Sequence, residues 1–394
     1  MSTVKDLDNL LERFVREKHL PGASLSVCQG ENLLYENCIG SRDMAGTVPM
    51  DTDTLFRIHS VTKPMTSLCG MLQYERGVFL MDDPVYEYLP EYRNIKISVR
   101  KDDGTWAVED AKETLLIRHL FNMNVGYYAY DDSPTAIGMR EVHERLGGSK
   151  MQSNYSQREE IRAMAEIPML FEPGTRWQYD YGLNILSSVI EESSGMSLGE
   201  FMKKNIFEPL GMKDTGFRFR PGWRERMAEC VQQLPDGGVK HCDDVLGDPL
   251  DSMYREEAVY EAADAGLISS LRDVQAFAGM LANGGIWKGE RIIGRKTLDM
   301  MRHNLQTKEM METFHTMMTD MKGYGYGYGV RTMVDPVSGL TNSSVGEFGW
   351  VGAAGPWMMA DPSEKLSASF MIQDMLPDGR YYHHRLRAVI NGLL

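Results

Sequence analysis

A serine and a lysine stand three residues apart in the stretch Ser60-Val61-Thr62-Lys63. On a helix, residues at this spacing lie on one face, about one turn apart. The lysine can then take the proton of the serine hydroxyl, and the serine oxygen can attack a carbonyl carbon. An apolar run begins at Pro64, so we expect Lys63 to be partly buried, which favours the neutral amine. The alternative is ordinary helix surface with Ser60 as an N-cap.

Two further motifs follow Ser60 and Lys63 along the chain. One is FEPGTRWQYDYGLN at residues 171–184, and the other is EFGWVGAAG at residues 347–355. The three motifs in this order resemble the serine β-lactamase and penicillin-recognising superfamily, especially the class C-like carboxylesterases known as family VIII esterases. The resemblance covers nearly the whole chain. It implies an α/β (α+β) fold, in which an antiparallel sheet flanked by helices joins a mostly helical lobe and the active site lies between them.

The resemblance implies a role for one or more residues of each motif. Ser60 is similar to the acylated nucleophile, Lys63 to the group that activates it, and Tyr179 to the tyrosine that relays the proton. Such a tyrosine needs a cationic neighbour before it can act as a base. The backbone N–H groups of Ser60 and Ala353 match the oxyanion hole. Gly352 matches the glycine that lets a strand approach the substrate.

Two positions depart from the β-lactamase pattern. Tyr181 stands where β-lactamases have asparagine, and Trp350 stands where they have lysine or histidine. A cation there helps to hold the carboxylate of a β-lactam, whereas tryptophan offers an apolar face and one N–H donor. The resemblance therefore favours neutral esters, with Trp350 and Tyr181 beside the substrate. Tyr127 and Tyr128 occupy the place of another superfamily loop and either line the pocket or pack on the lobe.

A second serine motif, GMSLG at residues 195–199, fits the nucleophile elbow of α/β-hydrolases. That elbow needs a strand before the serine and a helix after it, whereas an apolar helix is expected just before this motif. Gly195 instead indicates the end of that helix. Ser197, with Glu200 three residues later, indicates a capping box at the start of the next helix.

No metal or cofactor is expected. The nine histidines form no H-x-x-x-H pattern, and the adjacent His383 and His384 indicate solvated surface rather than a metal site. His59 is interpreted as a packed structural histidine. The five cysteines show no C-x-x-C spacing and indicate free, mostly buried thiols. They are Cys28, Cys38, Cys69, Cys230 and Cys242.

The composition is typical of a globular enzyme. The 394 residues are 42% hydrophobic and 25% charged, and they can bury a large core. The net charge of −14 disfavours nucleic acid and anionic membranes as partners. We find no apolar run of membrane-spanning length and no signal-peptide core, so we expect a cytoplasmic location. A small-molecule ester is the expected partner, and the oligomeric state is open.

Hydrophobic periodicity and turn residues predict the elements that hold these motifs. The first and last segments are expected to share one antiparallel sheet. Residues 1–75 and 255–394 form the predicted sheet domain, and residues 76–254 form the predicted helical domain. Residues 310–322, rich in methionine and threonine, are interpreted as an irregular stretch that could form a lid. The expected helices are 4–19, 185–195 and 380–394, and the expected strands are 23–28, 33–39, 326–334, 354–360 and 366–373.

We therefore predict a serine carboxylesterase for neutral esters that acts through an acyl-enzyme on Ser60. Three alternatives remain open. An acyltransferase would use the same three residues with an alcohol or amine as acceptor. A β-lactamase or D-amino-acid peptidase is disfavoured by Trp350. A non-catalytic binding protein on the same fold is disfavoured by the intact set Ser60, Lys63 and Tyr179.

Overall fold

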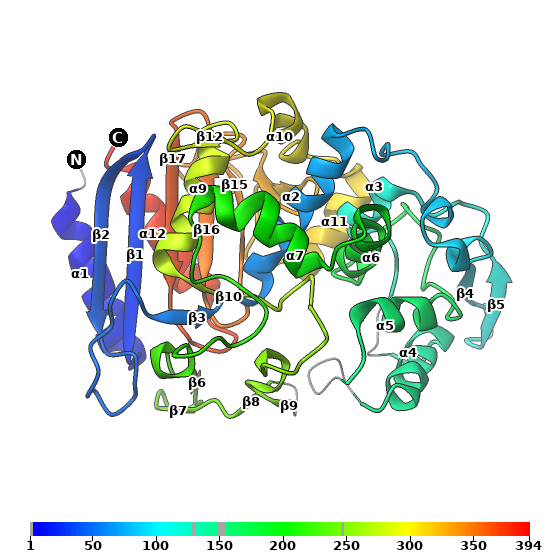
Figure 1. Cartoon of the computed structure of the whole chain (residues 1–394), viewed down its shortest axis with the longest axis horizontal. Coiled ribbons are helices and arrows are strands. Elements are labelled where there is room, and N and C mark those ends of the chain that lie inside the picture. Colours follow the sequence, from blue (N-terminus) through cyan, green and yellow to red (C-terminus); the bar gives the residue numbers. More distant parts are fainter. Residues whose placement is uncertain (1–2, 128–130, 149–153, 246–247) are drawn as a thin grey trace.

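An antiparallel sheet of seven strands forms the core of one half of the molecule (Figure 1). The computed structural model describes residues 3–127, 131–148, 154–245 and 248–394. The strand order is β13-β14-β15-β16-β17-β1-β2, so both ends of the chain contribute to this sheet. The strands are β1 (Gly22–Gln29), β2 (Asn32–Gly40), β13 (Tyr324–Tyr326), β14 (Arg331–Met333), β15 (Phe348–Val351), β16 (Trp357–Asp361) and β17 (Leu366–Met371).

Strand β1 joins the two ends of the chain. It pairs antiparallel with β2 in a hairpin and antiparallel with β17 on its other side, where Ser26 lies opposite Ser369. The predicted strands 23–28 and 33–39 and the sheet shared by the first and last segments are confirmed.

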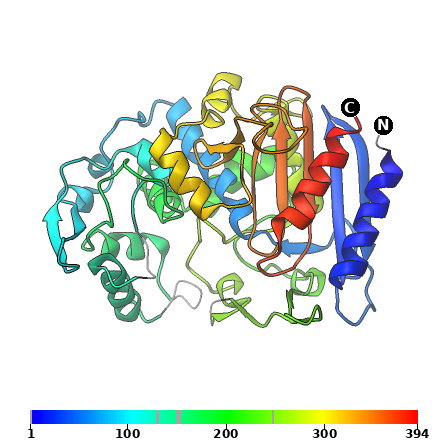
Figure 2. The same cartoon turned by 180° about the vertical axis from the view of Figure 1, so that it is seen from behind.

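Different helices cover the two faces of the sheet. On one face, α1 (Val4–Lys18) and α12 (Gly379–Asn391) pack their apolar sides against alternate residues of β1 and β17. On the other face, α9 (Leu271–Ala282) covers β1, β16 and β17, and its Gln275 donates a hydrogen bond of 2.8 Å to Ser367. Figure 1 shows α9 in front of the sheet, and Figure 2 shows α12 from behind. The predicted first and last helices are confirmed.

Helix α2 (Thr62–Glu75) lies between the sheet and the helical half. All its residues from Thr62 to Gln73 are buried. It contacts α6, α7 and α10 as well as β15 of the sheet. The serine–lysine motif therefore stands where the two halves meet. The domain boundaries at residues 75 and 254 stay predictions.

The remaining helices and five two-stranded sheets complete the described part of the structure. The remaining helices are α3 (Ile117–Phe121), α4 (Pro134–Arg145), α5 (Gln157–Met164), α6 (Gly182–Ser194), α7 (Leu198–Met202), α8 (Glu208–Leu210), α10 (Arg295–Met301) and α11 (Lys308–Met317). The two-stranded sheets are β3 (Leu55–Arg57) with β10 (Ile268–Ser270), β4 (Lys96–Arg100) with β5 (Trp106–Asp110), β6 (Val231–Gln233) with β7 (Val239–His241), β8 (Asp244–Val245) with β9 (Asp248–Pro249), and β11 (Ile286–Trp287) with β12 (Glu290–Arg291).

The predicted strand over residues 326–334 is wrong in its first half. A turn separates β13 from β14, closed by the hydrogen bond of 2.8 Å from Gly327 N–H to Val330 O. Gly329 has φ +75°, and a Cβ at this position would overlap the Ser67 side chain of α2. The glycines therefore allow a tight turn against α2.

Two other predictions are corrected by packing. The first half of the stretch 310–322 is helix α11, capped by Thr307, whose hydroxyl accepts from Met310 N–H, and anchored by the buried Phe314. His383 is buried on α12, where its ring stacks on Trp357 with centroids 5.8 Å apart. It is not the solvated surface residue that the adjacent histidine pair suggested. That residues 310–322 form a lid stays a prediction.

Candidate active site

Ser60 lies in the short 3₁₀ turn η1 (His59–Val61), which leads directly into α2. The preceding residue, His59, has φ +43°, a left-handed conformation that is costly for a residue with a side chain. The His59 ring is buried, and desolvation lowers its pKa to about 4, with the positive charges of Arg57 and Lys63 acting in the same direction. The serine therefore stands on a strained turn beside a neutral imidazole, which confirms His59 as a packed residue.

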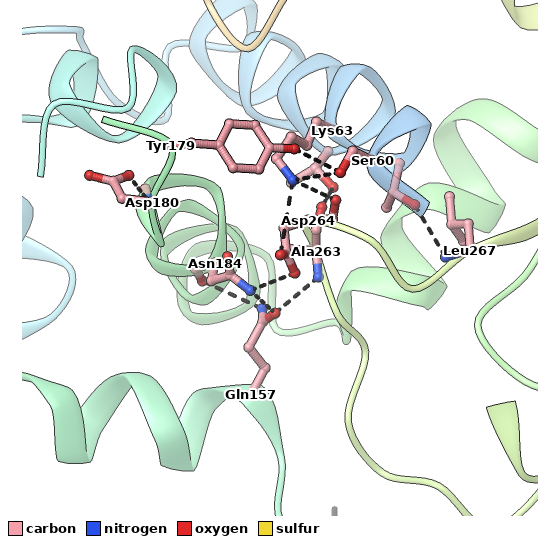
Figure 3. A network of polar contacts seen from close by, with 12 residues as sticks. Ser60, Lys63, Gln157, Tyr179, Asp180, Asn184, Ala263, Asp264 and Leu267 are labelled. Atoms are coloured by element: carbon pink, nitrogen blue, oxygen red, sulfur yellow. Dashed lines mark hydrogen bonds and ion pairs between the residues drawn. The ribbon is translucent and has the colours of Figure 1, made fainter. Parts of the chain in front are cut away.

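The structure brings Ser60, Lys63 and Tyr179 together (Figure 3). The Tyr179 hydroxyl donates to Ser60 Oγ at 2.7 Å, and Lys63 Nζ donates to the same oxygen at 3.3 Å. Lys63 Nζ also lies 4.5 Å from the centre of the Tyr179 ring. Both groups reach the serine oxygen, so either one, in its deprotonated form, can take the proton of Ser60.

The surroundings of Lys63 fix its position. Its side chain is only 1% exposed, and Nζ donates a 2.8 Å hydrogen bond to the backbone oxygen of Asp264. The Asp264 carboxylate lies 3.9 Å from Nζ and accepts a hydrogen bond of 3.1 Å from Asn184 Nδ2. The predicted burial of this lysine is confirmed, and the buried amine has the Asp264 carboxylate beside it.

Tyr179 is held by aromatic contacts and by the residue that follows it. Its ring stacks on Trp350 and contacts Trp177. The carboxylate of Asp180 accepts backbone N–H groups of Val125, Gly126 and Gly182 at 2.7–3.0 Å. Burial raises the pKa of Asp180 to about 7, although these hydrogen bonds oppose the shift. Asp180 thus ties the tyrosine loop to the 125–126 segment and to the start of α6.

The third motif packs against the turn that carries the nucleophile. A Cβ on Gly352 would come within 2.4 Å of Ile58 O and within 3.5 Å of His59 Cβ. Ala353, the next residue, is partly exposed. Its carbonyl oxygen accepts a hydrogen bond of 2.7 Å from Leu376 N–H. The missing side chain of Gly352 therefore permits close approach to the nucleophile turn itself. This geometry brings the segment containing Ala353 close to the segment containing Ser60.

The four aromatic residues assigned to the substrate differ in position. Trp350 is buried between Tyr179 and Tyr326. Tyr127 is also buried, and its hydroxyl donates to Met164 O at 3.1 Å, so it packs inside the helical half. Tyr181 is partly exposed at the start of α6. Tyr128 lies outside the described residues.

Three polar residues near Lys63 were not singled out by the sequence. Asp264, Asn184 and Gln157 form a chain of hydrogen bonds behind the lysine. Asn184 is the last residue of the second motif, so the sequence pattern did identify its segment. Asp264 and Gln157 belong to no motif, and only the contact between distant segments identifies them.

The second serine motif is a helix cap, as predicted. Ser197 Oγ accepts Glu200 N–H at 3.3 Å, and Glu200 accepts Ser197 N–H at 3.0 Å. Gly195 ends α6 in the left-handed conformation with φ +69°. Gly199 leaves room for the Glu261 carboxylate, which accepts its N–H at 2.7 Å. Each small residue of GMSLG therefore has a structural role.

The cysteines at positions 28, 38, 69, 230 and 242 are free thiols, and four of them are buried, as predicted. Across the described ranges, three or more His, Cys, Asp or Glu side chains nowhere gather closely enough to hold a metal ion. Nor does any described helix combine the length and apolarity needed to cross a membrane.

Comparison with known proteins finds relatives that match this chain over most of its length. Protein Rv1367c of Mycobacterium tuberculosis is 29% identical over 360 residues, covering 90% of this chain and 86% of its own. Esterase EstB of Burkholderia gladioli is 29% identical over 380 residues, covering 92% and 88%. The solved structure of EstCE1, a hydrolase with promiscuous acyltransferase activity, superposes with a TM-score of 0.81 at 22% identity and covers 98% of each chain. This likeness confirms the predicted fold class. The sequence model of the Beta-lactamase family matches residues 7–391, and the chain therefore belongs to the Beta-lactamase family.

Proposed function

We propose that this chain is a serine carboxylesterase that hydrolyses small neutral esters through an acyl-enzyme on Ser60. One observation carries the proposal: Tyr179 and Lys63 both donate hydrogen bonds to the oxygen of Ser60. Membership of the Beta-lactamase family supports a serine hydrolase, and the similarity to Esterase EstB supports ester substrates. The combination of motifs further supports placement among the family VIII esterases.

The geometry supports a two-step reaction. Ser60 Oγ would attack the ester carbonyl while its proton moves to the Tyr179–Lys63 pair, and the C=O π bond would open to an oxyanion. The oxyanion would collapse, the bond to the alcohol would break, and the pair would return the proton to the leaving oxygen. Water would then repeat the sequence on the acyl-enzyme and release the acid.

The oxyanion would lie between two backbone segments. We assign it to the N–H groups of Ser60 and Ala353, because Gly352 brings the second segment against Ile58 and His59. One such donor contributes about 3–4 kcal/mol to transition-state stabilisation. The Gly352 contact therefore bears directly on the rate of both steps.

The third motif supports neutral substrates. Trp350 occupies the position of the β-lactamase cation, and it is buried against Tyr179. A substrate carboxylate would find no positive charge from this residue. An acyltransferase reaction remains the second candidate, because EstCE1, which shares this fold, is a hydrolase with promiscuous acyltransferase activity. The free cysteines support a reducing, cytoplasmic compartment.

Intact-protein mass spectrometry tests the proposal. Wild type, Ser60→Ala and Ser197→Ala are each mixed briefly with p-nitrophenyl acetate and, separately, with a chromogenic cephalosporin. We expect an acetyl adduct on wild type and Ser197→Ala but not on Ser60→Ala, and faster turnover of the ester than of the cephalosporin. Ester turnover that survives in Ser60→Ala would defeat the mechanism. Addition of an alcohol acceptor separates transfer from hydrolysis, because transfer yields a new ester.

A further inference from the structure

Asp264 meets Lys63 through both its backbone and its side chain (Figure 3). The backbone oxygen accepts from Nζ at 2.8 Å, and carboxylate Oδ2 lies 3.9 Å from Nζ. The other carboxylate oxygen accepts from Asn184 at 3.1 Å. Gln157 supports Asn184 by accepting its Nδ2 at 2.9 Å, and it also accepts Ala263 N–H at 2.9 Å. The carboxylate is therefore held in place from behind.

The other titratable groups that face Lys63 have less effect on its charge than Asp264 has. His59 is buried and neutral, because its pKa is lowered to about 4. Tyr179 meets the ammonium with its ring face and reaches Ser60 with its hydroxyl. Asp180 is buried with its pKa raised to about 7, and its carboxylate is engaged by three backbone N–H groups. Among the described residues, Asp264 provides the carboxylate within ion-pair distance of Lys63.

We propose that Asp264 is a positioning residue that holds Lys63 as a cation beside Ser60, which is the charge state that the proton relay through Tyr179, implied by the family resemblance, requires. This inference rests on the proposed esterase function and deepens it. A carboxylate 3.9 Å from an ammonium favours the charged form of the lysine. A charged lysine has no lone pair for the serine proton, but it stabilises a phenolate beside it. The shorter of the two contacts to Ser60 Oγ is the one from Tyr179.

The proton then follows one route through both steps. Once the Tyr179 hydroxyl has lost its proton to water, the Ser60 proton moves to the phenolate oxygen as Oγ bonds to the carbonyl carbon and the C=O π bond opens to the oxyanion. The same proton passes from Tyr179 to the leaving alkoxide when the C–O bond breaks, which regenerates the phenolate. In deacylation, Tyr179 takes a proton from water and returns it to Ser60 Oγ. Lys63 keeps all its protons throughout, and no other reactant is needed.

The test is the pH dependence of kcat/KM for p-nitrophenyl acetate in Asp264→Asn. This change removes the charge but keeps the backbone oxygen that accepts from Lys63. The loss of a negative charge beside the site makes a proton there easier to remove. We expect the acid limb to move to lower pH by about one unit or more. We also expect the plateau of kcat to fall by about tenfold or more, because part of the lysine becomes neutral.

Two further variants separate the charge from the fold. Asp264→Glu keeps the charge, so its acid limb should lie near that of wild type. Asp273→Asn removes another buried carboxylate, which lies at the start of α9 and accepts Asp214 N–H. The acid limb of kcat/KM in this variant should not move. If Asp264→Asn shows no cooperative thermal transition, Asp264→Ser carries the same prediction.

The outcomes separate this inference from the proposed function. A wild type that forms no acetyl adduct on Ser60 would remove the function itself. Acetylation of wild type with the same acid limb in folded Asp264→Asn would overturn the role of Asp264 and leave the esterase intact. An equal shift in Asp273→Asn would also overturn it, because the effect would then not depend on contact with Lys63.

Discussion

The indole of Trp350 lies nearly parallel to the phenol ring of Tyr179, with the ring centroids 6.0 Å apart and an angle of 10° between the planes. Tyr326 meets the same indole edge-on at 5.4 Å, and Trp350 itself is 1% exposed. Lys63 Nζ also contacts the Tyr179 ring. The tryptophan of the third motif is therefore placed to orient the tyrosine of the second. Its predicted contact with substrate stays a prediction.

Replacement of Trp350 by leucine should lower kcat by about 10–100-fold with little change in KM. The reason is that the stacked contact, worth about 0.5–1.5 kcal/mol, is lost and the phenol can move relative to Ser60. Trp350→Phe keeps an aromatic face and should lose less. Steady-state kinetics with p-nitrophenyl acetate separates kcat from KM.

The matched control is Trp357→Leu, which removes the other tryptophan stacked at 10°, here on His383 beneath the opposite face of the sheet. We expect that variant to lose stability but keep the kcat of its folded fraction. A Trp350→Leu enzyme with unchanged kcat and a raised KM would contradict the orienting role and favour a direct contact with substrate.

Ser197→Ala should lower the free energy of unfolding by about 0.5–2 kcal/mol without loss of turnover. The change removes the hydroxyl that accepts Glu200 N–H at the first turn of α7. Urea unfolding followed by circular dichroism measures the first effect, and ester hydrolysis measures the second. Turnover that disappears in a folded Ser197→Ala protein would restore the nucleophile-elbow interpretation of GMSLG.

Sequence patterns predicted the elements whose information is local. Helix α1, the hairpin of β1 with β2 and the Ser197 cap each follow from residues within a few positions of one another. The order of three motifs was enough to select Ser60, Lys63 and Tyr179. Their meeting point depends on packing of α2 against α6, which no single motif contains.

Asp264 was missed because its role depends on a residue 201 positions away in the sequence. No spacing rule connects it to Lys63. By contrast, the misinterpretation of residues 310–322 ignored a signal that was present. Met310 and Phe314 are four residues apart and both are buried, which is helical periodicity. The burial of His383 was missed because the adjacent histidine pair was interpreted by itself. His383 belongs to the buried side of α12, whose residues recur every three to four positions.

The stability contribution of the neutral His383 should fall as pH decreases from about 6.5 toward 3. Burial lowers the pKa of His383 to about 3, whereas an unfolded histidine titrates near 6.5. The unfolded state therefore binds an extra proton in this window, and stability falls by about 1.4 kcal/mol per pH unit for this residue. The full contribution is present above pH 6.5.

Urea unfolding of wild type and His383→Gln at pH 7 and pH 5 isolates this residue. Asp180 and Glu191 have raised pKa values and shift stability in the opposite direction, but both proteins contain them and their effects cancel in the difference. We expect wild type to lose its advantage over His383→Gln as the pH falls. A difference independent of pH would show that His383 is not buried as the neutral ring.

Gly352→Ala should reduce kcat strongly while leaving most of the fold intact. A Cβ at this position would lie 2.4 Å from Ile58 O, far inside van der Waals contact, so either β15 or the η1 turn must shift. The turn already contains the left-handed His59, and the shift would change the distance between Ser60 and the segment of Ala353. Loss of one oxyanion donor costs about 100–1,000-fold in kcat, and we expect a reduction of that order.

The control for Gly352→Ala is Ala353→Gly, which removes a methyl group from the neighbouring residue and introduces no overlap. It should keep most of its activity, because its backbone N–H remains. Thermal unfolding of both variants distinguishes a local shift of the turn from loss of the fold. Labelling by a fluorophosphonate shows whether Ser60 still reacts. If Gly352→Ala keeps wild-type kcat, then the close approach of β15 to the nucleophile turn does not set the geometry of the oxyanion hole.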